Sequence, residues 1–219
     1  MSSRRGLARQ LAALAGFDSP DASLEQYPTS ADLAAHLVHL ADLHGDLADR
    51  VVLDLGTGTG ILALGAAIRD PARVVGIERD WAALAIARRN THDLAPPVDP
   101  DWVQGDATRP PVCADDATVL MNPPFGAQDG QEHADRAFLE AASRVGNVSY
   151  SVHNAGSRGF LNAFVRDAGA ALTHAFAAEI PLKRSHPWHE SDEEAIEAVV
   201  VRIDWTDVTR NGTSPGSQA

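Results

Sequence analysis

The sequence predicts an α/β fold in which helices cover both faces of a mostly parallel seven-stranded sheet that ends in an antiparallel pair. From residue 50 to residue 169, short apolar runs of strand type alternate with segments of helical periodicity. This alternation is typical of parallel sheets, because each parallel connection needs a crossover that is usually a helix. Beyond residue 170, two strand-like runs follow each other with no helix between them. Strands joined in that way pair antiparallel, so we expect the sheet to end in such a pair.

The individual elements follow from apolar patterning and from the residues that begin or end them. The predicted strands are 50–55, 73–78, 101–106, 117–122, 147–152, 171–182 and 194–205. The predicted helices are 3–15, 30–44, 60–68, 81–90, 136–145 and 157–169. Asp80 can cap the helix that begins at residue 81, and Gly169 can end the last helix. The fourth strand must stop by Met121, because Pro123 and Pro124 have no N–H to donate to a sheet.

Length and composition predict a single domain. The chain has 219 residues, and no apolar run is long enough to span a membrane. We expect one domain over 1–205, in which 1–45 is a helical extension, followed by a disordered polar tail over 206–219. The single cysteine, Cys113, excludes an internal disulfide and a multi-cysteine metal site. A reducing cytoplasm is the default compartment, and no metal site is expected.

The charge of the chain leaves its partner class open. The formal net charge is −12, and Lys183 is the single lysine. An acidic surface normally argues against a nucleic-acid substrate. The same composition also fits adaptation to concentrated salt, which screens charges over a few ångströms. Net charge therefore does not exclude a nucleic-acid substrate.

A glycine-rich turn follows the first predicted strand. Gly56, Gly58 and Gly60 separate that strand from a helix, where glycine lets the backbone turn sharply and approach a ligand. Glu78 ends the next strand, about 20 residues downstream, where a carboxylate can accept the hydroxyls of a ribose. A tight turn alone is the simpler interpretation of the glycines. The order of strand, turn, helix, strand and carboxylate favours an adenosine-type cofactor.

S-adenosylmethionine is the cofactor that these residues favour. No Lys-Ser or Lys-Thr pair follows the glycines to hold phosphates, and the second half of the chain is not a second nucleotide unit. Asp54 can meet the cofactor ammonium, and Asp106 can accept from the adenine amine, although Asp106 can also be a turn-forming residue. Gly56, Gly58, Thr59 and Gly60 would line the cofactor. A dinucleotide site remains the weaker alternative.

The sequence Asn122-Pro123-Pro124-Phe125 follows the fourth strand, where ligands of parallel sheets bind. The lone pair of an amide or exocyclic amine is delocalised, which makes its methylation difficult. The Asn122 side-chain oxygen and the Pro123 carbonyl can accept both hydrogens of such an amine and favour a pyramidal nitrogen. Asn122 would also contact the cofactor, and Phe125 can stack on a planar substrate. A rigid Pro-Pro turn with no ligand is the alternative.

Several motifs resemble one enzyme family. The NPPF motif after a glycine-rich turn is similar to that of class I S-adenosylmethionine-dependent amino-methyltransferases, which have a Rossmann-like fold. "LEQYPTSADLAAHL" (24–37) resembles the methyltransferase-like 5 family more narrowly, as do "NPPFGAQ", Asp135 before "AFL", "YSVH" (150–153) and "EIPL". The resemblance covers about 7–205 and implies N6-adenosine methylation of small-subunit ribosomal RNA. The acidic, lysine-poor composition suggests an archaeal, salt-adapted member.

The resemblance also implies residue roles and a partner. Gln26 and Thr29 would help enclose the cofactor, although Thr29 can simply cap the following helix, and Asp135 reads better as a helix cap than as an acid. A small zinc-binding activator subunit would add a strand to 101–106, the expected edge in the order 3-2-1-4-5-7-6. The alternative is an edge blunted by nearby prolines, with no partner.

The expected RNA contacts lie near the carboxyl ends of the strands, where the cofactor would bind. Phe125, Lys183, Arg184 and Trp188 are the candidate substrate-binding residues, although the loop that follows Lys183 is less basic than the resemblance leads us to expect. Two other functions stay open: a protein glutamine N-methyltransferase, which uses a similar NPP-aromatic turn, and a non-catalytic ribosome-assembly factor. The motif "EQYPT" favours the RNA enzyme over the former, and an intact Asn122 argues against the latter.

Overall fold

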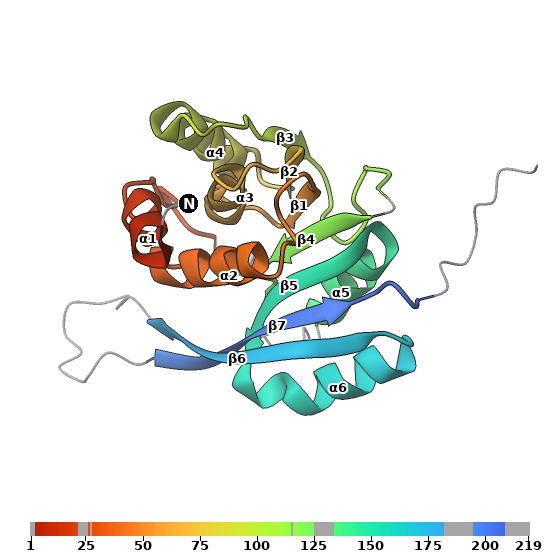
Figure 1. Cartoon of the computed structure of the whole chain (residues 1–219). Coiled ribbons are helices and arrows are strands. Elements are labelled where there is room, and N and C mark those ends of the chain that lie inside the picture. The colour runs from red at the N-terminus through yellow and green to blue at the C-terminus, as the bar shows by residue number, and fades with distance from the viewer. Residues whose placement is uncertain are drawn as a thin grey trace, which may run out of the picture.

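The computed structural model describes residues 3–21, 26, 28–114, 116–124, 134–181 and 195–208. It contains a seven-stranded sheet with the strand order β3-β2-β1-β4-β5-β7-β6, which confirms the predicted fold class and order (Figure 1). The strands are β1 (Val51–Leu55), β2 (Arg73–Glu78), β3 (Asp101–Gln104), β4 (Ala117–Met121), β5 (Gly146–Asn154), β6 (Ala171–Pro181) and β7 (Ala195–Asp204). The helices are α1 (Arg4–Leu11), α2 (Ala31–Leu43), α3 (Ile61–Ala67), α4 (Trp81–Leu94), α5 (Ala134–Val145) and α6 (Arg158–Asp167), with a short 3₁₀ helix η2 (Ala155–Ser157).

The sheet is parallel from β3 to β5 and antiparallel at its other end. Strand β1 pairs in parallel with β2 and β4, β2 pairs with β3, and β4 pairs with β5. Strand β7 lies between β5 and β6 and runs antiparallel to both. The predicted terminal antiparallel pair is therefore correct, and β3 is an edge of the sheet as expected.

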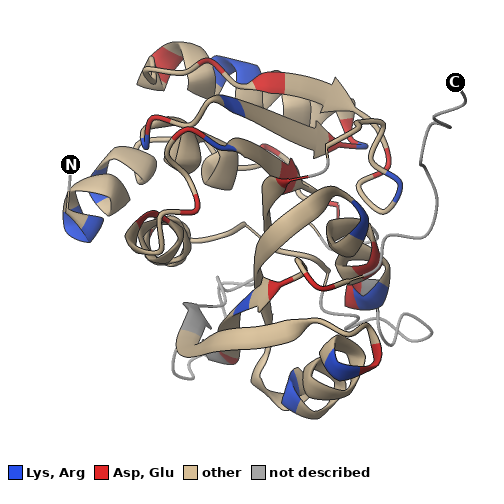
Figure 2. Ribbon diagram, turned by 45° about the vertical axis from the view of Figure 1, so that its right-hand side comes forward, with Lys and Arg blue, Asp and Glu red and all other residues tan. Residues whose placement is uncertain are grey.

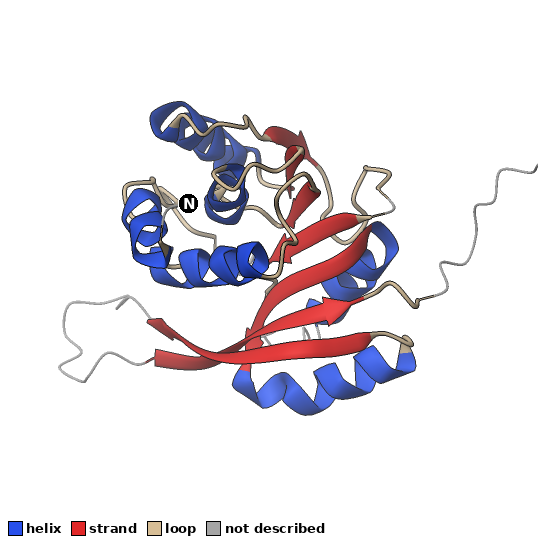
Figure 3. Cartoon of the chain, in the orientation of Figure 1, coloured by secondary structure: helices blue, strands red, loops and turns tan. Residues whose placement is uncertain are grey.

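Helices cover both faces of the sheet (Figure 3). One layer of buried apolar side chains lies between the helices and the sheet on each face. On one face α1, α2 and α3 pack around Leu37, Leu62 and Tyr150. On the other face α5 and α6 pack around Leu139 and Trp205. Fully burying one large apolar side chain stabilises the fold by roughly 1.5–3 kcal/mol, so these layers drive folding. Within the described part of the chain, no helix combines the length and the apolar character needed to cross a membrane.

Most helix ends follow their local signals, and two do not. The Asp80 side chain accepts from the Ala82 N–H and caps α4, and Gly169 adopts a φ of 72° just after α6. The alternative that Thr29 caps the second helix is wrong, because Ser30 is the cap and accepts from the Leu33 N–H. The expectation that Asp135 is a cap is wrong as well. It lies inside the first turn of α5, and its carboxylate bonds a side chain of the sheet instead.

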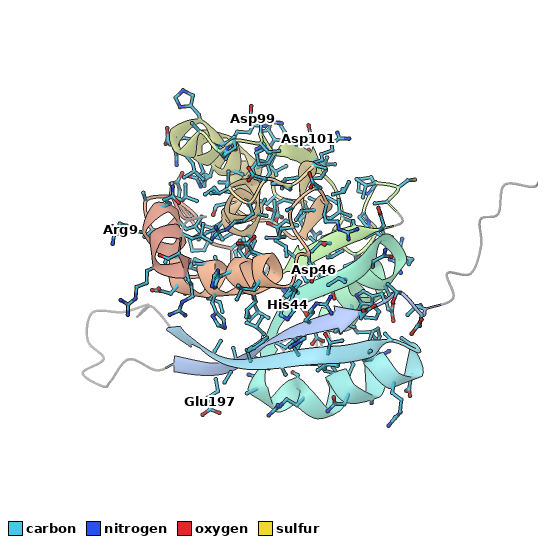
Figure 4. The ribbon with its side chains drawn as sticks, viewed as in Figure 1. Arg9, His44, Asp46, Asp99, Asp101 and Glu197 are labelled. Atoms are coloured by element: carbon cyan, nitrogen blue, oxygen red, sulfur yellow. The ribbon has the colours of Figure 1, made fainter. Side chains whose placement is uncertain are left out.

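A buried polar network joins the end of α2 to the centre of the sheet. Asp46 follows α2 and lies close to His44 (Figure 4). Its Oδ2 accepts from the Tyr150 hydroxyl at 2.6 Å and from Arg202 Nε at 2.9 Å. The Thr118 hydroxyl donates to the Asp46 carbonyl oxygen, so β4, β5 and β7 all contact this residue. Burial, followed by the hydrogen bond to Asp46, raises the pKa of Tyr150. The network fixes the N-terminal extension to the sheet.

The Asp46→Ala substitution should lower the free energy of unfolding by roughly 3 kcal/mol, the low end for removing one partner of a buried pair. The reason is that Arg202 and the Tyr150 hydroxyl lose their acceptor, and the Asp46 and Arg202 side chains are only 14% and 13% exposed. Urea denaturation measures the change. Asp167→Ala is the control, because its ion pair with Arg166 is mostly exposed and should contribute less than about 0.5 kcal/mol. Equal losses for both variants would contradict the assigned role of Asp46.

Candidate active site

The carboxyl ends of β1, β2 and β4 meet at one edge of the sheet. Leu55, the last residue of β1, is level with Ile77 of β2 and with Met121 of β4. The glycine turn, Glu78 and Asn122 therefore leave the sheet side by side, although they are far apart in the sequence. In open α/β sheets, ligands bind at this edge.

The glycine turn adopts a backbone that other residues rarely adopt. Gly56, Gly58 and Gly60 have φ values of 72°, 55° and 89°. A Cβ atom on Gly60 would lie 2.7 Å from Cη2 of Trp102, so a side chain there would clash as well as strain the backbone. The Gly56 and Thr57 N–H groups donate to the Ile77 carbonyl, which holds the turn against β2. Glycine is thus required by conformation and by space.

Asp54 is a buried carboxylate with one oxygen left over. It is 1% exposed, and its Oδ2 accepts from the Thr57 hydroxyl and from the Ala63 N–H. Its Oδ1 is buried and has no hydrogen-bond partner among the described residues. Burial above all, and then the nearby Glu78 carboxylate, raises the pKa of Asp54 to about 7, against the effect of its hydrogen bonds. A cationic group at Oδ1 would satisfy this oxygen.

Glu78 is fixed at the end of β2 by three backbone N–H groups. Its Oε2 accepts from Gly58 at 3.0 Å, and its Oε1 accepts from Arg79 at 2.8 Å and from Asp80 at 3.0 Å. The carboxylate is therefore oriented by the glycine turn and by the start of α4. Each oxygen of a carboxylate has two lone pairs, so Oε2 keeps capacity for one more donor. The ribose contact stays a prediction, and Oε2 is the atom that can make it.

Asp106 lies in the turn after β3 and is exposed. Its Oδ1 accepts from the hydroxyl and from the N–H of Thr108, and these bonds lower the pKa of Asp106. The turn-forming role offered as an alternative is thus present in the structure. An adenine amine would have to use Oδ2, and this contact stays a prediction.

The segment before α2 reaches both sides of this edge. Gln26 Nε2 donates to Asp80 Oδ2 at 2.8 Å, next to the start of α4. Thr29 Oγ1 accepts from Asn122 Nδ2 at 2.9 Å, at the end of β4. The structure therefore brings both residues to the predicted site, and Thr29 contacts Asn122 rather than capping its own helix.

Asn122 is held with its side-chain oxygen free. Its Nδ2 is used by Thr29, while its Oδ1 is buried and has no hydrogen-bond partner in the described parts of the chain. Pro123 is buried beside it, and β4 ends at Met121 as predicted. The other candidate substrate-binding residues lie outside the described residues and stay predictions: Phe125, Lys183, Arg184 and Trp188.

Sequence reasoning missed two residues of this edge, Phe17 and Asn90. Asn90 of α4 is 1% exposed, donates to the carbonyl oxygens of Ala15 and Thr59, and accepts from the Ala15 N–H. It therefore clamps the chain after α1 onto the glycine turn. The ring of Phe17 rests against Gly58, where a Cβ atom would lie 3.0 Å from its Cζ. Asn90 follows buried Ala83 at helical spacing, the one signal that could have found it, and Phe17 has no local signal.

These groups fit S-adenosylmethionine. The orphaned Asp54 Oδ1 is a carboxylate acceptor suited to an ammonium group, and the orphaned Asn122 Oδ1 is a neutral acceptor suited to an N–H. The close approach of the glycine turn and the Glu78 carboxylate complete a surface for an adenosyl group. Within the described ranges, no three His, Cys, Asp or Glu side chains are grouped so that they could hold a metal ion.

Comparisons with known proteins agree with this geometry. Residues 29–147 match the model of the methyltransferase small domain family. The chain is 33% identical to the uncharacterized protein MJ0284 of Methanocaldococcus jannaschii, over 93% of this chain and 95% of that protein. It is 32% identical to the rRNA N6-adenosine-methyltransferase METTL5 of Danio rerio, over 86% of this chain and 92% of that protein. The crystal structure of PH1948 from Pyrococcus horikoshii, a proposed RNA methyltransferase, superimposes with a TM-score of 0.81 at 33% identity and covers 93% of this chain and 98% of that chain.

Cofactor affinity should depend on pH through Asp54, whose pKa is raised to about 7. The ammonium of S-adenosylmethionine favours the ionised carboxylate, so binding below pH 7 must first release a proton. The dissociation constant should therefore rise about tenfold per pH unit as the pH falls below 7, and should level off above it. Titration calorimetry between pH 5.5 and 7.5 checks this. Asp54→Asn should bind more weakly with a flat profile, and a wild-type affinity that is independent of pH would contradict the contact.

Proposed function

We propose that this chain, which belongs to the methyltransferase small domain family and is an S-adenosylmethionine-dependent methyltransferase, modifies the N6 amine of an adenosine in small-subunit ribosomal RNA. The observation that carries this proposal is the free Oδ1 of Asn122 at the end of β4. The full-length similarity to METTL5, which is named as an rRNA N6-adenosine-methyltransferase, supports the choice of acceptor.

The proposed chemistry at the amine needs two acceptors and no side-chain base. When bound, S-adenosylmethionine supplies an electrophilic methyl group. Asn122 Oδ1 and the Pro123 carbonyl accept the two amine hydrogens, which favours a pyramidal nitrogen with an available lone pair. Thr29 keeps the Asn122 amide in one orientation through the bond to its Nδ2. The proton leaves after the nitrogen has become cationic, so it can pass to water.

Exposed cationic side chains on α1 and at the start of α6 support an RNA substrate despite the net charge of −12. Helix α1 carries exposed Arg4, Arg5 and Arg9, seen as blue segments beside the N-terminus (Figure 2). Exposed Arg158 begins α6, just beyond the carboxyl end of β5. Each phosphate contact contributes a log–log salt slope of about −0.7 to −0.9, so few contacts suit an enzyme that works in salt. With ribosomal RNA as substrate, the proposed compartment is the cytoplasm.

Mass spectrometry of ribosomal RNA nucleosides tests this function. In cells that lack the gene, N6-methyladenosine in small-subunit RNA should fall, and the wild-type gene should restore it. A gene carrying Asn122→Ala should not restore it, although the purified variant should bind S-adenosylmethionine within about threefold of wild type, because Asn122 acts mainly on the amine. Unchanged N6-methyladenosine in the deletion strain would refute the proposal. Methylation of a protein glutamine instead would assign the chain to the glutamine enzymes, and no methylation with impaired ribosome assembly would assign it to the assembly factors.

We also propose that a small zinc-binding activator subunit adds a strand to β3. In the described sheet β3 pairs with β2 alone, so its other side presents unpaired backbone groups. Pro96, Pro97 and Pro100 lie in the loop before β3, and β3 itself contains four residues and no proline.

Co-expression with the activator protein of the same organism should give a stable heterodimer and raise the melting temperature by roughly 5–10 °C, as expected for a partner well above its dissociation constant. Size-exclusion chromatography and thermal melting measure both effects. A chain that stays monomeric and melts at the same temperature with and without that protein contradicts the proposed partner.

A further inference from the structure

A buried row of three hydrogen-bonded side chains lies between β5 and α5, next to the end of β4. His153 near the end of β5 is 1% exposed, its Nδ1 lies 3.0 Å from Asp135 Oδ2, and its Nε2 lies 2.8 Å from Ser151 Oγ. A carboxylate can only accept, so Nδ1 carries the proton and donates to Asp135. The Ser151 hydroxyl then donates to Nε2 of the neutral ring. Each polar group of the ring is thus satisfied without water.

This arrangement resembles a serine hydrolase triad, but its burial excludes that chemistry. A nucleophilic serine must reach its substrate, whereas Ser151 is 0% exposed. The proposed methyl transfer uses none of these groups directly. These three side chains are buried and hydrogen-bonded to one another near the end of β4. They can therefore affect methyl transfer only through another residue.

The strand register places His153 next to the end of β4. Met121, the last residue of β4, is level with Ser151 of β5, so Asn122 and Pro123 leave the sheet beside the carboxyl end of β5, where His153 lies. Alternate residues of a strand share a face, so the side chains of Ser151 and His153 point to the same face as Met121. The intervening Asn122 points to the opposite face, where Thr29 holds it. The end of β4 is therefore supported from both faces.

Asp135 connects this support to the chain that follows the active site. The polypeptide leaves the sheet after Met121, and Asp135 lies in the first turn of α5 further along. Through its bond to His153, the start of α5 is fixed to β5 next to the point where the chain left β4. The Asp135 side chain is 11% exposed and that of His153 is 0% exposed, so little water competes with this bond.

We propose that His153 is a positioning residue for methyl transfer: with Ser151 and Asp135 it holds the end of β4 and the start of α5 so that the Pro123 carbonyl stays in place beside Asn122 Oδ1. This inference rests on the proposed function, since it concerns the acceptor pair for the amine. A displacement of about 1 Å in such a pair can lower a rate by about 100-fold.

Two matched substitutions at His153 separate positioning from simple packing. The amide nitrogen of Asn can replace Nδ1 and keep the bond to Asp135, whereas Gln reaches the Nε2 position and leaves Asp135 without a partner. His153→Gln should lower kcat by about 10–100-fold, His153→Asn should retain most of it, and the affinity for S-adenosylmethionine should stay within about twofold for both. Asp135→Ala, which removes the acceptor for Nδ1, should match His153→Gln, and the double variant should be no worse than either. His92→Gln is the control, because the His92 side chain is 90% exposed.

Single-turnover methylation of ribosomal RNA, titration calorimetry and thermal melting give the three readouts. A folded His153→Gln variant with wild-type kcat overturns the inference. So does a loss of kcat matched by an equal loss of cofactor affinity or of folded protein, since that marks a packing role alone.

A wild-type protein that leaves RNA unmodified would refute the proposed function, and the inference is then decided by amide hydrogen exchange. The Met121 and Asn122 amides should exchange faster in His153→Gln than in wild type, and should be unchanged in His92→Gln. Equal exchange in all three proteins overturns the positioning role whatever the substrate is.

Discussion

Backbone hydrogen bonds align Leu55, Met121 and Ser151 across the parallel strands β1, β4 and β5, and the candidate site depends on this alignment. It brings the glycine turn, Asn122 and His153 together at the carboxyl ends of these strands. Because side chains alternate between faces, a slip of one residue in β4 would turn Asn122 away from Thr29 and toward α5. The apolar layers on both faces resist that slip, since it would move buried residues of β4 to the wrong face. Core packing thus fixes the register of β4 and, with it, the direction in which the Asn122 side chain points.

Buried polar groups differ between the centre of the sheet and its carboxyl end. Around Asp46, the carboxylate, the Tyr150 hydroxyl and Arg202 form hydrogen bonds with one another, and this network stabilises the fold. At the carboxyl end, Asp54 Oδ1 and Asn122 Oδ1 are buried without a partner among the described residues. A buried acceptor without a hydrogen bond lowers the free energy of unfolding by roughly 1–3 kcal/mol. A ligand that donates to this acceptor removes the penalty. Functional sites are where such local costs are expected.

What could be predicted from the sequence is what short-range chemistry determines. The end of β4 at Met121 follows from two prolines, and the glycine turn follows from backbone conformations that glycine alone adopts easily. Local rules failed where a distant residue competed for a side chain. Threonine is a common helix cap, but the side chain of Thr29 is bonded to Asn122, 93 positions away. Ser30 caps α2 instead. Asp135 likewise lies in the first turn of α5, where its carboxylate bonds His153 of the sheet instead of capping the helix. No periodicity encodes such pairs.

The N-terminal segment completes a site that the alternating strands and helices leave open. Gln26 is bonded to Asp80 beside β2, where the predicted ribose acceptor lies, and Thr29 is bonded to Asn122 at the end of β4. Three residues along the chain thus separate a contact on the cofactor side from a contact on the amine side. Asn90 fixes the preceding chain at Ala15 onto the glycine turn, so the segment is held at both ends. The extension before β1 therefore contributes side chains to both halves of the candidate active site.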